Sequence, residues 1–107
     1  MSAKCGVDDF VDCTAFQRDL LWALSHENDR KGISLKEELT DYYGEDLNHS
    51  RIYQNLDKLV HRGLISKQPR DNRTNEYRLT ETARRALSAR QAWQAGEKSK
   101  LDNGSDI

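Results

Sequence analysis

Polar and basic side chains recur at helical spacing between residues 48 and 63. The polar set is Ser50, Arg51, Gln54, Lys58 and Arg62, and the apolar set between them is Ile52, Leu56, Leu59 and Val60. At about 100° per residue the two sets project to opposite sides of a helix. Side chains of the polar set hydrogen-bond base edges in the DNA major groove or neutralise phosphates. The spacing therefore predicts a helix that packs through one face and contacts DNA through the other.

Within this set the position along the helix suggests which group each side chain meets. The N-terminal half of such a helix usually enters the groove, so we expect Arg51 and Gln54 to contact bases and Lys58 and Arg62 to contact phosphates. The competing interpretation is an ordinary solvated helix face.

The ends of the helix are marked. Asn48 is a favourable N-cap, and Gly63 stands where a left-handed residue would end the helix. Tyr53 and Asn55 lie at the border between the two faces, so each is expected to pack in part while its polar atoms reach DNA.

A basic hairpin is predicted directly after the helix. Segments 63–67 and 76–79 are strand-like, and residues 68–75 between them are turn formers that include Pro69, the single proline. The tip carries Arg70, Asn72 and Arg73, which would lie along the backbone or enter the minor groove, where narrow tracts attract arginine. Alone this could be any hydrated loop, but its adjacency to the basic helix favours DNA binding.

Charge is unevenly distributed over the 107 residues. Residues 48–80 hold seven Lys and Arg against three Asp and Glu, a net +4, whereas the rest of the chain is net −5 and the total is −1. A basic segment in an otherwise acidic chain fits nucleic acid. The alternative is a protein-interaction module that docks an acidic partner through the same face.

Three further helices are expected around this segment. Thr14 and Gln17 form a capping box for a helix whose core face carries Phe16, Leu20, Ala23 and Leu24, with Trp22 pointing out. Ser34 and Glu37 form a second box for a helix ending near 43–44, preceded by a short strand at 32–33. Thr80 caps a last helix over 81–94, whose stripe is Ala83, Ala86, Leu87, Arg90 and Trp93.

The resulting fold class is α+β, mainly α with a small β-hairpin: a winged helix-turn-helix with a C-terminal dimerisation helix. We expect a flexible arm at 1–12 pinned by Phe10 and Val11, the winged domain at 13–80, the dimerisation helix at 81–95 and a disordered tail at 96–107. No apolar run approaches the roughly 20 residues of a membrane span and the N-terminus lacks a signal peptide, so we expect a cytoplasmic protein.

Enzymatic and metal chemistry find no motif in the sequence. There is no Gly-rich phosphate loop, no HExxH and no nucleophile with an evident base, so we expect no enzyme, no cofactor and no metal site. His26, near a helix C-terminus, suits a structural role. Cys5 and Cys13 are expected to be reduced thiols, and a thiol-based redox sensor is the alternative.

The segments 52–65 and 76–87 resemble the PadR-like winged helix-turn-helix transcriptional regulators over roughly residues 14 to 93. The matching residues are Tyr53, Leu56, Leu59, Gly63, Leu64, Ile65, Tyr77, Leu79 and Thr80. The chain departs at Gln54-Asn55, where members often have Pro-Ala, and at Ala83, where they often have Gly. Two polar side chains at the first departure could add base contacts.

The resemblance implies a repressor that binds a pseudo-palindromic operator in double-stranded DNA as a homodimer. The C-terminal and first helices would form the interface, with Phe16, Trp22, Ala86, Leu87, Arg90 and Trp93 as its residues. In some relatives, apolar side chains around the dimer axis bind flat aromatic ligands. A ligand pocket between Trp22 and Trp93 and simple dimer packing are therefore the two alternatives there.

Overall fold

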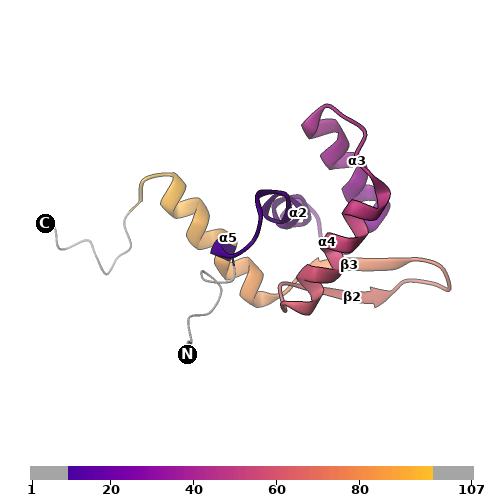
Figure 1. Ribbon diagram of the computed structural model, residues 1–107. Coiled ribbons are helices and arrows are strands. Elements are labelled where there is room, and N and C mark those ends of the chain that lie inside the picture. Colours follow the sequence, from indigo (N-terminus) through magenta and orange to yellow (C-terminus); the bar gives the residue numbers. More distant parts are fainter. Residues whose placement is uncertain (1–9, 98–107) are drawn as a thin grey trace, which may run out of the picture.

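The computed structural model describes residues 10–97, and the expected arm at 1–9 and tail at 98–107 lie outside this part. Its elements are α2 (Ala15–Ser25), β1 (Arg30–Lys31), α3 (Gly32–Tyr43), α4 (His49–His61), β2 (Ile65–Pro69), β3 (Asn75–Leu79) and α5 (Glu81–Gln94). Figure 1 shows α4 beside the β2–β3 hairpin, whose tip extends away from the helices, while α5 runs in the opposite direction. The predicted winged helix-turn-helix class is confirmed.

Helix α2 begins at the predicted capping box. The Thr14 hydroxyl accepts a hydrogen bond from the Gln17 N–H, and the Gln17 side-chain oxygen accepts one from the Thr14 N–H, both at 3.1 Å. The helix buries Phe16, Leu20, Leu21, Ala23 and Leu24. Its apolar face is therefore the centre of the core, as the periodicity predicts.

The second predicted capping box is wrong. Helix α3 begins at Gly32, after Lys31, and within the described chain Lys31 supplies no side-chain cap. Ser34 does not cap because its hydroxyl accepts hydrogen bonds from Arg30 at 3.1 and 2.7 Å. The short strand is Arg30–Lys31 rather than residues 32–33. Gly44 ends the helix in the left-handed region at φ 76°, as expected.

The sheet has three antiparallel strands in the order β1-β3-β2, not two. Strand β1 adds to the predicted hairpin through the pairing of Arg30 with Tyr77. Strand β2 extends to Pro69, which pairs with Asn75, so the turn is shorter than the predicted 68–75. A proline is tolerated there because β2 is an edge strand that leaves one row of backbone groups unpaired.

Helices α4 and α5 have the predicted boundaries. The Asn48 side chain accepts hydrogen bonds from the N–H groups of Ser50 and Arg51, and Gly63 follows the helix at φ 78°. The Thr80 hydroxyl caps α5, which ends at Gln94. None of the helices in residues 10–97 is long and apolar enough to cross a membrane.

The chain before α2 folds back onto the core. Phe10 is buried at 2% exposure, and Arg18 donates hydrogen bonds to the carbonyls of Phe10 and Val11 at 3.2 and 2.9 Å. Phe10 meets Trp22 edge-on, with ring centroids 6.4 Å apart. The predicted apolar contact at this end is confirmed, but the predicted exposure of Trp22 is wrong, because Phe10 covers part of its ring and leaves it half-buried.

Candidate nucleic-acid interface

Helix α4 separates its two faces as the spacing predicts. Ile52, Leu56 and Leu59 are fully buried, and Val60 packs against the core. On the opposite side the exposed residues are Ser50, Arg51, Gln54, Lys58 and Arg62. Packing of the apolar face therefore fixes the polar face outward.

Arg51 is held in place by an aromatic ring from α2. Its guanidinium carbon lies 3.9 Å from the centroid of the Phe16 ring, a cation–π contact. Phe16, at 6% exposure, also meets Tyr43 edge-on at 5.8 Å. Stacking leaves the edge of the guanidinium free for planar hydrogen bonds, and it places Phe16 beneath α4, not on a surface that a second subunit could reach.

Asn55 is turned towards α2. Its Oδ1 accepts a hydrogen bond from the Gln17 side chain at 3.0 Å, and its Nδ2 donates to the Arg51 carbonyl at 2.8 Å. Both polar ends of Asn55 are thus engaged within the chain, whereas Gln54 beside it is exposed. Sequence reasoning missed Gln17 as a partner because its capping role already accounted for a polar residue at that position.

Tyr53 packs into a space that a glycine leaves open. A Cβ at Gly32 would lie 2.5 Å from the Tyr53 ring, and the His49 ring lies 4.5 Å away on centroids. Burial raises the pKa of the Tyr53 hydroxyl, so it remains a protonated donor. The proximity of Gly32 and Tyr53 was not detectable from sequence, because it depends on how α3 crosses α4.

The hairpin tip is shaped by Asp71. Its carboxylate accepts hydrogen bonds from the N–H groups of Arg73 and Thr74, both at 2.9 Å, and these bonds, Arg73 first, lower the pKa of Asp71. Arg70 pairs with Glu76 at 3.0 Å. Asn72 and Arg73 are exposed at the tip. The tip therefore presents Arg73 while Arg70 is drawn back along the strand.

Two other charged residues near α4 are paired. Lys67 in β2 lies 3.4 Å from Asp57, which offsets the one carboxylate on the exposed side of α4. Arg62 lies 3.9 Å from Asp12, and its side chain is 32% exposed. Arg62 is thus partly covered, and the remaining basic groups on the outer face are those of Arg51 and Lys58.

Comparison with known proteins identifies the family. The model of the transcriptional regulator PadR-like family matches residues 20–89. The chain belongs to this family. No curated protein sequence matches it. The match covers most of α2 through most of α5, which confirms the resemblance drawn from residues 52–65 and 76–87.

Solved structures agree with this PadR-like assignment. RosR in the complex hsRosR-S4 is 44% identical with a TM-score of 0.82, over 85% of this chain and 78% of that one. H. salinarum RosR grown from NaBr is 46% identical with a TM-score of 0.76, over 79% and 76%. E. coli MarR complexed with operator DNA shares the fold at 21% identity and a TM-score of 0.65, over 84% and 62%.

In this PadR-like chain the residues expected at a dimer interface divide into two groups. Ala86 and Leu87 are buried in the single chain, like Phe16. Trp93 is 68% exposed, and the Arg90 guanidinium stacks on its ring at 4.7 Å. Trp93 and Arg90, together with Phe10, Val11, Ala86 and Ala89, line a hollow of about 300 Å³.

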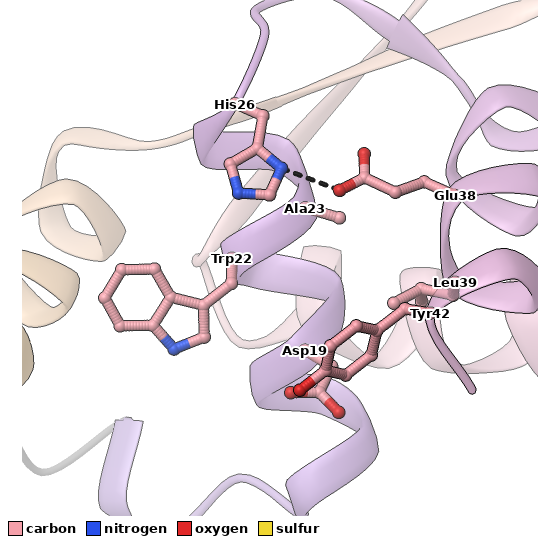
Figure 2. A pocket seen from close by; sticks show the side chains of 7 residues that line it. All are labelled: Asp19, Trp22, Ala23, His26, Glu38, Leu39 and Tyr42. Carbon is pink, nitrogen blue, oxygen red and sulfur yellow. Dashed lines mark hydrogen bonds and ion pairs between the residues drawn. The ribbon is translucent and has the colours of Figure 1, made fainter.

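Trp22 and Trp93 do not line a common pocket within the chain. Trp22 borders a pocket between α2 and α3, together with Asp19, Ala23, His26, Glu38, Leu39 and Tyr42, whereas Trp93 borders the hollow against α5 (Figure 2). Cys13 is buried, and Cys5 lies outside the described residues.

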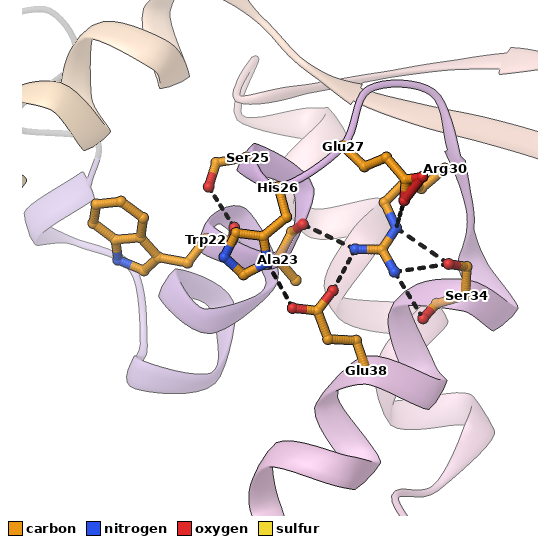
Figure 3. A network of polar contacts seen from close by, with 8 residues as sticks. All are labelled: Trp22, Ala23, Ser25, His26, Glu27, Arg30, Ser34 and Glu38. Carbon is orange, nitrogen blue, oxygen red and sulfur yellow. Dashed lines mark hydrogen bonds and ion pairs between the residues drawn. The ribbon is translucent and has the colours of Figure 1, made fainter.

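The PadR-like fold also contains a polar network that sequence reasoning missed (Figure 3). Arg30, 9% exposed, donates to the Ala23 carbonyl at 2.9 Å, to Ser34 and to Glu38 at 2.5 Å. His26, at the end of α2 as expected, meets the other Glu38 oxygen at 2.7 Å. Burial acts to raise the pKa of Glu38, but the hydrogen bonds from Arg30 and His26 outweigh it and the pKa lies below its usual range. The network fixes α2 to α3 and so positions the helix-turn-helix pair.

Proposed function

We propose that this PadR-like regulator binds double-stranded DNA through α4, with the β2–β3 hairpin alongside, and represses transcription as a homodimer on a pseudo-palindromic operator. The observation that carries the proposal is the division of α4 into a buried apolar face and an exposed face with Ser50, Arg51, Gln54 and Lys58. These side chains match the donors and acceptors of base edges and phosphates. Arg73 at the hairpin tip adds a contact to the backbone or minor groove.

Relatives with the same fold support a DNA partner. E. coli MarR is described in complex with operator DNA, and S. pneumoniae FabT, 15% identical with a TM-score of 0.67, in complex with DNA. In a homodimer two α4 helices would enter successive major grooves about 34 Å apart, which requires a two-fold related operator.

The exposed end of α5 is the proposed dimer contact. Trp93 is a large exposed aromatic beside an apolar hollow, and such residues become anchors when an interface buries them. A second copy of α5 fits this position because identical helices can cross at a two-fold axis. A flat aromatic ligand, which the family resemblance implies, would compete for the same hollow.

DNA selected from a random library by the purified protein tests the proposal. We expect an enriched pseudo-palindrome whose affinity falls steeply with salt, weakened by Arg51→Ala, Gln54→Ala or Arg73→Ala. Arg85→Ala, an exposed arginine on α5, is the matched control. Unchanged affinity and salt dependence in all three variants would show that the assigned surface is wrong. Absence of salt-sensitive DNA binding would instead favour an acidic protein partner.

Repression and dimerisation have separate tests. A reporter gene placed behind the selected operator should be expressed less when the protein is present, and a rise in expression would contradict a repressor. Sedimentation should give a dimer that Trp93→Ala shifts towards monomer. A parent protein that sediments as a monomer on its own and as one copy per operator would contradict the homodimer.

A further inference from the structure

The pocket between α2 and α3 has the size of a small-molecule site. Its volume is about 310 Å³, at the lower end of the range for ligand pockets, roughly 300 to 1,000 Å³. Trp22 and Tyr42 stand on either side of it, and Asp19 and the His26–Glu38 pair lie between them (Figure 2). The pocket lies in one chain and is separate from both the α4 face and the hollow beside Trp93.

The charged groups that line this pocket favour a cation. Asp19 and Glu38 contribute carboxylates, and the lining residues include no Lys or Arg. Glu38 is already neutralised, because Arg30 and His26 occupy its two oxygens. Asp19 differs: within residues 10–97 it accepts the Tyr43 hydroxyl at 2.5 Å and forms no ion pair. One carboxylate in the pocket therefore keeps its negative charge without a counter-ion.

The Tyr43 contact keeps Asp19 in place without neutralising it. Burial and the neighbouring Asp19 carboxylate raise the pKa of Tyr43 far above its usual value, so the hydroxyl stays protonated and donates to Asp19. The bond engages Oδ2, and Oδ1 remains available to a donor in the pocket.

The aromatic rings provide the second requirement of a cation site. Tyr42 is 76% exposed, and Trp22 is half-buried with Phe10 against its edge. The π faces of tryptophan and tyrosine attract cations, most of all weakly hydrated alkylammonium ions. A neutral aromatic compound would gain nothing from the Asp19 charge, and an anion would be repelled by it.

We propose that the α2–α3 pocket binds a small substituted ammonium ion, with its charge near Asp19 and its alkyl groups against Trp22 and Tyr42. The site does not depend on the proposed DNA interface, but it lies close to it in the fold. Helix α3, which forms one wall, packs directly against α4.

Fluorescence of Trp22 can test this site directly. The chain has two tryptophans, so Trp93→Phe leaves Trp22 as the reporter. Choline is the probe, and 3,3-dimethylbutan-1-ol, which has the same shape without the charge, is the matched neutral compound. At constant ionic strength we expect a saturable change in Trp22 emission with choline, and binding at least about tenfold weaker for the neutral compound, because one unscreened charge contact is lost.

Variants in the same background assign the charge. Asp19→Asn should weaken choline binding about tenfold while its amide oxygen still accepts the Tyr43 hydroxyl, and Tyr42→Ala should weaken it too. Asp41→Asn, an exposed neighbour outside the pocket, should leave it unchanged. Equal binding of the two compounds, equal binding by the Asp19 and Asp41 variants, or no shift of the Trp22 indole N–H by NMR would each overturn the proposal.

Discussion

Gln17 donates a hydrogen bond to Asn55 at 3.0 Å, and this contact joins the first helix of the domain to α4. It separates the functions of two adjacent residues that depart from the family pattern. Asn55 is used for packing between helices, whereas Gln54 is left exposed on the DNA-facing side. The departure at 54–55 therefore combines a structural substitution with one that faces the proposed operator.

Asn55→Ala should lower the free energy of unfolding by about 1 kcal/mol, because it removes one hydrogen bond and leaves the Gln17 amide without that partner. Gln54→Ala should leave stability unchanged, since its side chain is exposed. Urea unfolding of both variants measures the difference. In a double-mutant cycle with Gln17→Ala, the Asn55 effect should shrink, and strict additivity would argue against the contact.

Gly32→Ala should destabilise the protein by about 1 kcal/mol, although alanine favours helices over glycine. The added Cβ would lie 2.5 Å from the Tyr53 ring, which is half-buried beside His49 and cannot move without losing contacts. Thermal unfolding gives the measurement. In a Tyr53→Ala background the clash is gone, so Gly32→Ala should become neutral or stabilising; continued destabilisation there would assign the effect to the helix start instead.

Much of the fold followed from local signals. The caps at Thr14, Asn48 and Thr80, together with the helical apolar spacing, predicted the starts of α2, α4 and α5, because these signals act within a few residues. The capping box at Ser34 failed because Arg30 competes for the same hydroxyl. That competition depends on the tertiary position of Arg30, which a local pattern does not contain.

The candidate site was predicted in the same uneven way. The exposed face of α4 followed from helical periodicity, since burial of one face determines the other. Strand β1, the Gly32–Tyr53 contact and the turning of Asn55 towards Gln17 did not, because each joins elements distant in sequence. The cover of Phe10 over Trp22 belongs to the same class.

Glu38→Gln should reduce stability at neutral pH by about 1 to 2 kcal/mol by weakening its bonds to Arg30 and His26. The pKa of Glu38 is lowered in the folded protein, so its contribution is complete above the unfolded-state value of 4.5 and is lost as pH falls through the folded-state pKa. Parent and variant should therefore converge in acid. Urea unfolding from about pH 7 to about pH 3 tests this, with exposed Glu37→Gln as control.

The salt dependence of operator binding should separate phosphate contacts from base contacts. Lys58→Ala and Arg73→Ala each remove an exposed charge that would neutralise a phosphate, so each should lower the slope of log affinity against log salt by about 1. Gln54→Ala carries no charge change, so it should weaken the selected operator by about 1 to 3 kcal/mol and leave the slope and the affinity for unrelated DNA intact. Fluorescence anisotropy at several salt concentrations measures both quantities. A changed slope with Gln54→Ala, or equal losses on operator and unrelated DNA, would contradict its assignment to a base.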